Sequence, residues 1–154
     1  MVGRDSRQTV LITGCSQGGI GESLALEFNS RGYRVFATAR EAKSINHLAD
    51  LGIECLSLEV TKPESIKNLK EEIRERTGGR LDYLVNNAGK NYTVPALEID
   101  FAEVEDLFRV NVFAVMMMVQ EFTEFILRAE GRIVMIGSLS SVMYVESRGI
   151  LCRS

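Results

Sequence analysis

The chain has 154 residues, of which 45% are hydrophobic and 25% charged, as is typical of one globular domain with a single core. A net charge of -3 at pH 7 excludes a basic surface for nucleic acid. His47 is the only histidine and the three cysteines form no CxxC pair, so we expect no metal site. With no secretory signal visible, we expect a cytoplasmic protein, with peripheral membrane association as the alternative.

The first apolar run, residues 10–12, is continuous rather than alternating and predicts a strand covered on both faces. It leads into a glycine-rich turn, followed by apolar residues every four positions that predict a helix. Such a turn lets the backbone approach a diphosphate, and the helix N-terminus offers unpaired amides. The alternative is a tight turn without a ligand. The residues assigned to phosphate binding are Thr13, Gly14, Ser16, Gln17, Gly18, Gly19, Ile20 and Gly21.

The second apolar run, residues 35–37, leads to Ala39 and Arg40. Sites specific for NAD usually have an acidic residue at the end of this strand, whereas an arginine accommodates the 2'-phosphate of NADP. Ala39 occupies the acidic position, and the Arg40 guanidinium suits bidentate phosphate contact. The sequence therefore predicts NADP(H), with a solvated loop arginine beside Glu41 as the alternative.

The third apolar run, residues 55–58, precedes a charged helix. Thr61 and Glu64 have the spacing of a capping box, and Pro63 suits the first turn. Gly78 and Gly79 predict the end of the helix. Its buried stripe is expected to consist of Ile66, Leu69 and Ile73.

The fourth apolar run, residues 83–85, ends in Asn86-Asn87-Ala88-Gly89. Side-chain amides at this strand end are expected to satisfy backbone groups that the sheet leaves unpaired. Small Ala88 and Gly89 permit a close approach of the nucleotide. A turn formed without any ligand is the alternative, since Asn and Gly both tolerate left-handed backbone.

A long helix is predicted from about Val104 to Leu127, and its broad apolar face suggests a homo-oligomer. Asn111 lies on this face, where its amide needs a local partner. The longest apolar stretch, residues 110–119, is shorter than the roughly 20 residues that cross a bilayer, so no transmembrane segment is expected. The apolar face comprises Leu107, Phe108, Val112, Val115, Val119, Phe122 and Ile126.

A fifth apolar run, residues 133–136, precedes Gly137 and Ser138. The repeated alternation of strand and helix predicts right-handed crossovers and a doubly wound, Rossmann-like α/β sheet of about five parallel strands. Residues 1–154 are expected to form one domain. The alternation alone also fits a flavodoxin-like module for another phosphate ligand.

Taken together, these motifs resemble the classical short-chain dehydrogenase/reductase family. The turn is similar to its T-G-x-x-x-G-x-G motif with one additional residue, in the form found in members similar to 1-acyldihydroxyacetone-phosphate reductase. N-N-A-G matches letter for letter. The resemblance implies an oxidoreductase that reduces a lipid-like carbonyl with NADP(H). It places Glu59 and Val60 at the adenine, Asn111 in a proton relay and Ser138 at the substrate oxygen.

The family's catalytic Tyr-x-x-x-Lys occurs nowhere in the 154 residues. Family spacing would place the tyrosine at Leu151, whereas Tyr144 and Arg148 form a Tyr-x-x-x-Arg only six residues after Ser138. We interpret residues 139–154 as a non-homologous tail on a C-terminally truncated chain that lacks the family's last strands. The resemblance therefore implies an open, apolar edge at the fifth strand. Two hypotheses follow: a reductase without full activity, or a non-catalytic NADP-binding fragment that associates with a full-length subunit.

Overall fold

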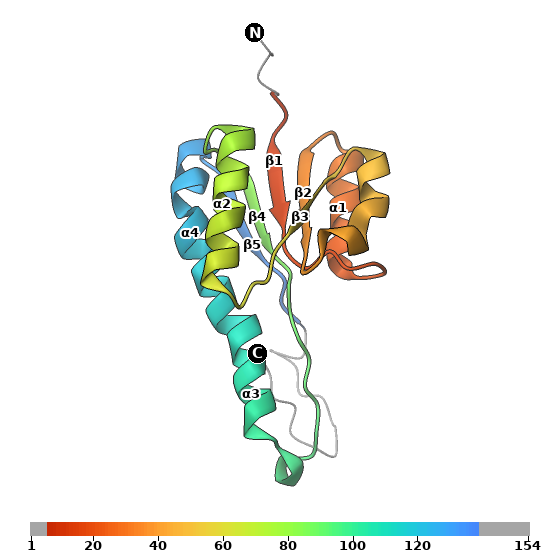
Figure 1. Cartoon of the computed structure of the whole chain (residues 1–154), viewed down its shortest axis with the longest axis vertical. Helices are drawn as coiled ribbons and strands as arrows, with labels where there is room; N and C mark the ends of the chain where they lie inside the picture. Colours follow the sequence, from red (N-terminus) through yellow and green to blue (C-terminus); the bar gives the residue numbers. More distant parts are fainter. Residues whose placement is uncertain (1–5, 139–154) are drawn as a thin grey trace.

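The computed structural model describes residues 6–138. Its five strands are all parallel, and they are β1 (Thr9–Ile12), β2 (Arg34–Ala39), β3 (Glu54–Ser57), β4 (Tyr83–Asn86) and β5 (Arg132–Met135). They form one sheet in the order β3-β2-β1-β4-β5 (Figure 1). From β1 the strand order runs to one side through β2 and β3 and then, from β4, to the other side through β5. This reversal of strand order at β1 and β4 confirms the doubly wound architecture.

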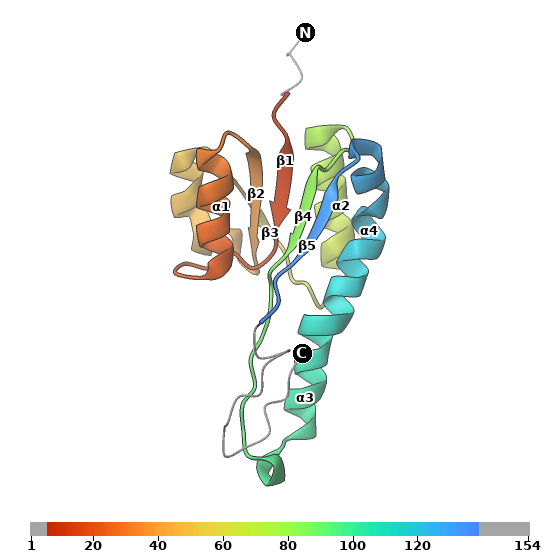
Figure 2. The same ribbon diagram turned by 180° about the vertical axis from the view of Figure 1, so that it is seen from behind.

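Seven helical segments connect and extend the strands, and they lie on both faces of the sheet (Figures 1 and 2). The helices of residues 63–77 and 114–129 pack on one face of the sheet, and those of residues 20–30 and 42–51 pack on the other. The segments are α1 (Ile20–Ser30), the 3₁₀ segment η1 (Ala42–Leu51), α2 (Pro63–Thr77), η2 (Ala96–Glu98), α3 (Phe101–Phe108), the π-helical η3 (Arg109–Phe113) and α4 (Ala114–Ala129).

The predicted long helix is confirmed, but it begins earlier than expected. The carboxylate of Asp100 accepts a hydrogen bond from the backbone amide of Ala102 at 2.9 Å and so caps the first turn. The helix then runs through α3, η3 and α4 and ends before Glu130, which has a left-handed φ of 54°. The first turn lies outside the predicted apolar face, and Phe101 in it is exposed to solvent.

The capping box predicted at the start of α2 is wrong. Lys62 is the N-cap residue, and its side chain makes no capping hydrogen bond. The Thr61 hydroxyl instead donates to a carboxylate oxygen of Glu59 at 3.0 Å. Pro63 begins the helix without a capping side chain because proline has no N–H to satisfy and a φ already suited to the helix. The end at Gly78, in a left-handed conformation, is as predicted.

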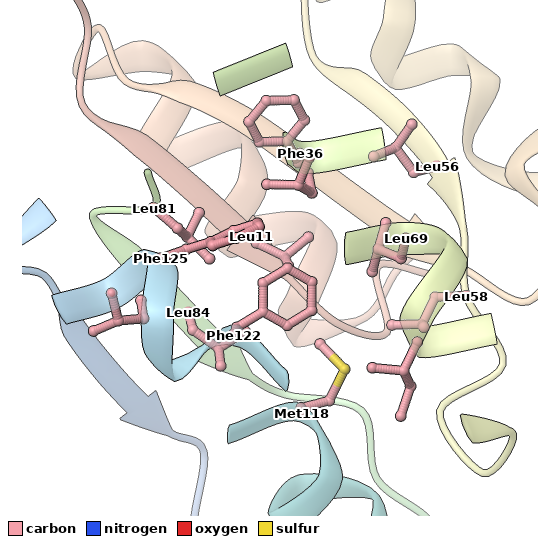
Figure 3. Close-up of a cluster of buried hydrophobic side chains, with 13 residues drawn as sticks. Leu11, Phe36, Leu56, Leu58, Leu69, Leu81, Leu84, Met118, Phe122 and Phe125 are labelled. Carbon is pink, nitrogen blue, oxygen red and sulfur yellow. The ribbon is translucent and has the colours of Figure 1, made fainter. Parts of the chain in front are cut away.

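Two apolar cores lie on opposite faces of the sheet. The first packs α2 and α4 on the strands, and in it Phe122 and Phe125 meet edge to face with ring centroids 5.9 Å apart (Figure 3). It includes the predicted stripe of α2, which is fully buried. The second joins α1 and η1 to the sheet through Ala25, Ile45 and Leu48. Both faces of the central strands are therefore covered, as the continuous apolar runs predicted.

The strand β5 forms the open edge that the sequence predicted. Among residues 6–138 it pairs only with β4, and Ile133, Met135 and Ile136 expose 38%, 54% and 38% of their surface. Asp82, the residue before β4, accepts hydrogen bonds from the amide and hydroxyl of Thr9 at 2.8 and 2.9 Å. This contact fixes the start of β1 beside β4.

The continuous helix of residues 101–129 is long and apolar enough to cross a bilayer, which the ten-residue stretch did not predict. Core helices of globular domains satisfy the same criterion. The second half of this helix buries Met118, Phe122 and Phe125 against the sheet. Its composition is therefore weak evidence for a membrane span.

Replacing Phe122 by alanine tests the α4 core. Because Phe122 is fully buried, we expect Phe122→Ala to lower the free energy of unfolding by about 3–5 kcal/mol, the usual cost of deleting a buried aromatic ring. Urea denaturation of the purified chain measures it. Leu127→Ala is the matched control on the same helix, because Leu127 is 72% exposed, and equal losses in the two variants would contradict this packing.

Candidate functional site

The candidate site lies where β1 and β4 end side by side, at the point where the strand order reverses. Open parallel sheets bind ligands in the crevice that forms there. Two loops meet at this point, the glycine-rich turn after β1 and the Asn87–Gly89 segment after β4. Hydrogen bonds and close backbone contacts between these loops determine the shape of the site.

Thr13 joins the two loops from beneath. Its hydroxyl oxygen accepts hydrogen bonds from the amides of Asn87 at 3.0 Å and Ala88 at 2.9 Å, and the hydroxyl donates to the carbonyl of Val85 at 3.4 Å. The side chain is almost completely buried. Thr13, predicted as a cofactor residue, therefore supports the turn from within the protein.

Asn87, the residue after β4, also joins the two loops. Its side-chain amide donates to the carbonyls of Thr13 and Gly14, each at 2.9 Å. This is the arrangement expected from the sequence, in which an asparagine amide satisfies backbone groups beyond the last strand pairing. Asn86, the preceding residue, is buried, and its amide contacts the sulfur of Met135 on β5.

Two glycines allow the loops to approach each other. A Cβ on Gly14 would lie 2.8 Å from the Cα of Ala88, and the φ of Gly14 is +73°. A Cβ on Gly21 would lie 2.4 Å from the carbonyl oxygen of Gly14 and 2.5 Å from the side-chain amide of Asn87. Real Cβ contacts are not this short, so each position requires glycine.

The outer part of the turn is open to solvent. Ser16, Gln17 and Gly18 are exposed, and α1 begins at Ile20 with the unpaired amides of a first helical turn. Amides and helix dipole together favour an anion at this place. Cys15 lies behind the turn instead, where burial raises the pKa of its thiol to about 12 and keeps it protonated.

Arg40 follows β2 directly and is exposed. The hydroxyl of Ser57 donates to the Arg40 carbonyl at 2.8 Å and fixes the backbone there. Glu59, which the resemblance places at the adenine, lies two residues after the neighbouring strand β3, and its carboxylate accepts from the amide and hydroxyl of Thr61 at 3.3 and 3.0 Å. Val60 is half-buried against the core beneath α2.

Asn111 lies in the π-helical segment η3, and its predicted local partner is the backbone of Lys90. The Asn111 side chain accepts from the Lys90 amide and donates to the Lys90 carbonyl, both at 2.8 Å. A π-helical turn inserts one residue into a helix and often marks a functional position. Gly89 lies beside this contact, since a Cβ there would be 3.5 Å from the Asn111 oxygen.

Lys90 is a site residue that sequence reasoning missed. Its ammonium contacts Asp106 at 2.6 Å and Glu103 at 2.7 Å on α3. Asp106 first, and then Glu103, raise the pKa of Lys90 by accepting its hydrogen bonds, while Lys90 lowers the pKa of Asp106. The only sequence signal was its position next to the N-N-A-G segment.

Ser138 follows β5 and is exposed at the same end of the sheet. The candidate pair Tyr144 and Arg148, the expected tyrosine position Leu151 and the tail 139–154 lie outside the described residues. Between residues 6 and 138 no three His, Cys, Asp or Glu side chains gather to hold a metal ion.

The fold and the paired loops define an α/β domain for a dinucleotide, and the comparisons with known proteins name its family. The family model described as short chain dehydrogenase matches residues 8–150. The chain therefore belongs to the short-chain dehydrogenase family, whose members are oxidoreductases with a nicotinamide cofactor.

Among curated proteins, a short-chain dehydrogenase of Penicillium ochrochloron is 48% identical over 136 residues, which are 88% of this chain and 50% of the relative. The NADPH-dependent 1-acyldihydroxyacetone phosphate reductase of Schizosaccharomyces pombe is 41% identical, covering 89% of this chain and 46% of that enzyme. The chain thus spans about half the length of the curated relatives it matches.

Solved structures agree on the fold. A short-chain dehydrogenase from Streptomyces avermitilis superimposes with a TM-score of 0.83 at 30% identity, covering 91% of this chain and 52% of that one. An alcohol dehydrogenase from Thermococcus sibiricus, complexed with 5-hydroxy-NADP, has a TM-score of 0.81 at 27% identity, over 90% and 61% of the two chains.

Thr13→Val tests the connection between the loops. Valine keeps the shape of the side chain but leaves the amides of Asn87 and Ala88 without their acceptor, so we expect a loss of about 2–4 kcal/mol in unfolding free energy. Chemical denaturation measures the loss. Thr38→Val is the control, because the equally buried Thr38 hydroxyl only donates, to the Ile12 carbonyl at 3.0 Å. A smaller loss in Thr13→Val than in the control would refute the assignment.

The Lys90 ion pairs predict a pH dependence. The pKa of Asp106 is lower in the folded chain, so its contribution is complete above the ordinary carboxyl range and is lost as the pH falls through the folded-state pKa. The raised pKa of Lys90 preserves the contribution until the pH rises through that pKa. The melting temperatures of wild type and Lys90→Met should therefore differ at neutral pH and converge at both extremes. A constant difference would argue for lost packing alone.

Proposed function

We propose that this chain binds NADP(H) and belongs to a reductase of small-molecule carbonyl compounds. We propose a lipid-like carbonyl compound as the substrate. The observation that carries the proposal is the exposed Arg40 at the end of β2, next to a buried Ala39 where an NAD site would have its acid. A guanidinium at that place supplies paired donors to a 2'-phosphate. The relative from Schizosaccharomyces pombe, NADPH-dependent by name, supports this cofactor and the lipid-type substrate.

The paired loops would hold such a cofactor. The exposed outer turn, Ser16 to Gly18, and the first amides of α1 would bind the diphosphate, and Arg40 the 2'-phosphate. Asn87, Ala88 and Gly89 shape the wall beside the nucleotide. The bound cofactor would supply a hydride to the carbonyl carbon. Glu59 and Val60, which follow β3, would border the adenine.

On the substrate side, Ser138 would donate a hydrogen bond to the carbonyl oxygen. Asn111 holds the loop at Lys90 and would support a proton path to that oxygen. No Tyr-x-x-x-Lys completes this set within the 154 residues. We therefore propose full cofactor binding but little turnover for this polypeptide by itself.

The alternative is a non-catalytic NADP-binding chain that associates with a full-length subunit. The missing Tyr-x-x-x-Lys favours it. Exposed apolar residues on the long helix, Phe108, Phe113 and Met116, would support such contacts or a homo-oligomer. The free thiols of Cys15 and Cys55 support a cytoplasmic location for either form.

Cofactor titration tests the proposal. Fluorescence titration of the purified chain should show tighter binding of NADPH than of NADH. Arg40→Gln should weaken NADPH binding by about tenfold to a hundredfold, since hydrogen bonds to a charged group contribute about 1.5–3 kcal/mol, and leave NADH unchanged. Lys43→Gln, which removes an exposed charge from the following segment, is the control.

Activity separates the two functions. Ketone-dependent oxidation of NADPH by the chain alone, abolished in Tyr144→Phe, would contradict the expectation of little turnover. Binding of neither cofactor would contradict both functions. Equal affinity for NADPH and NADH, unchanged in Arg40→Gln, would contradict the preference for NADP(H) alone.

A further inference from the structure

The glycine-rich turn holds one of its own amides with a side chain of α1. Gly18, within the Gly18–Gly19 pair that lengthens the turn, has a left-handed φ of +77°. Its amide donates to a carboxylate oxygen of Glu22 at 2.6 Å. The other carboxylate oxygen of Glu22 contacts the ring nitrogen Nε2 of His47 on η1. A chain of contacts thus runs from the turn through α1 to the segment that follows Arg40.

Gly18, at the tip of the lengthened turn, is exposed to solvent. No atom lies within 4 Å of the place where a Cβ on Gly18 would be, so the space on that side of the residue is open. The Gly19 amide donates back to the Ser16 carbonyl at 3.0 Å, which closes the turn on itself. The Gly18–Glu22 bond attaches this closed turn to α1, together with the bonds that the amide and hydroxyl of Ser23 donate to the Gly19 carbonyl at 3.2 and 3.3 Å.

Glu22 is well placed to hold the tip. It lies in the first turn of α1, where the helix dipole stabilises a carboxylate, and its side chain is only 14% exposed. The hydrogen bond from His47, and then that from Gly18, lower the pKa of Glu22 and keep it ionised. His47 is itself carried by a fixed segment, because Ile45 and Leu48 of η1 are completely buried.

We propose that Glu22 is a positioning residue for cofactor binding, which holds the Gly18 amide and so fixes the lengthened turn in the shape that receives the diphosphate. His47 orients Glu22 from η1. Glu22 acts through Gly18 and makes no contact with the cofactor. The inference rests on the proposed binding of NADP(H) and adds the residue that prepares the diphosphate part of the site.

The arrangement also joins the two phosphate contacts of the proposed site. Arg40 lies two residues before η1. His47 of η1 contacts Glu22, which in turn accepts from the Gly18 amide of the turn. A second hydrogen bond, from the side-chain amide of Asn29 to the Leu51 carbonyl at 3.0 Å, fixes the far end of η1 to the end of α1. Hydrogen bonds therefore join η1 to the first and the last turn of α1.

Affinity measurements on the whole chain test the role of Glu22. We expect Glu22→Ala to weaken NADPH binding about tenfold, which corresponds to about 1.4 kcal/mol. Glu22→Gln should stay within about threefold of wild type, because its amide oxygen can still accept from Gly18. Glu27→Ala is the control, since Glu27 lies on the same helix and pairs with Arg31 away from the turn. Circular dichroism and melting temperature show whether each variant folds.

A cofactor fragment separates positioning from general damage to the fold. Adenosine 2'-monophosphate has the 2'-phosphate but no diphosphate, so its affinity, measured by NMR titration, should be the same in wild type and Glu22→Ala. His47→Ala approaches the same contact from the other side and should weaken NADPH binding by a smaller factor. It replaces Glu22→Ala as the test if that variant does not fold.

The outcomes are distinct. Wild-type affinity for NADPH in Glu22→Ala, or an equal loss for NADPH and for adenosine 2'-monophosphate, would overturn the inference while leaving the proposed function intact. Loss in Glu22→Gln equal to that in Glu22→Ala would also overturn it. No binding of NADPH by the wild-type chain would overturn the proposed function and this inference with it.

Discussion

The contact between the ends of β1 and β4 is the constraint on which the site depends. The Thr13 hydroxyl accepts hydrogen bonds from two backbone amides of the loop after β4. The side-chain amide of Asn87 donates hydrogen bonds to two backbone carbonyls of the turn after β1. These bonds bring the backbones so close that only glycine fits at positions 14 and 21. The glycines of the turn therefore serve contact between protein segments as much as approach to a ligand, and the two requirements coincide at the same residues.

The sequence predicted the architecture well because the apolar pattern has a direct physical cause. Strands buried on both faces must be apolar throughout, and all five runs became strands with boundaries shifted by a residue or two. Helix starts were less predictable. The hydroxyl of Thr61 donates to Glu59 instead of accepting from an amide of the helix that it was expected to cap. The long helix begins at Phe101, after the Asp100 cap, in a turn that lies outside the predicted apolar face.

The site was predictable by residue type but less so by direction. Motifs identified Thr13, Asn87 and Asn111 as site residues. Their spacing did not show that the Thr13 side chain is buried, or that the Asn111 side chain binds the backbone of Lys90, 21 positions away. His47 was considered only as a metal ligand, because its contact with Glu22 joins residues 25 positions apart. Contacts of this kind depend on how elements pack, which local sequence does not encode.

The pairing of β1 with β4 also orders events during folding. Thr9 and Asp82, which adjoin each other at the start of these strands, are 73 positions apart in the chain, so a large loop must close before they meet. Contacts of such separation form slowly, whereas β1, β2 and β3 follow one another and can pair earlier. During synthesis, the glycine-rich turn leaves the ribosome well before Asn87. It acquires its final shape only after Asn87 has emerged and β4 has joined the sheet.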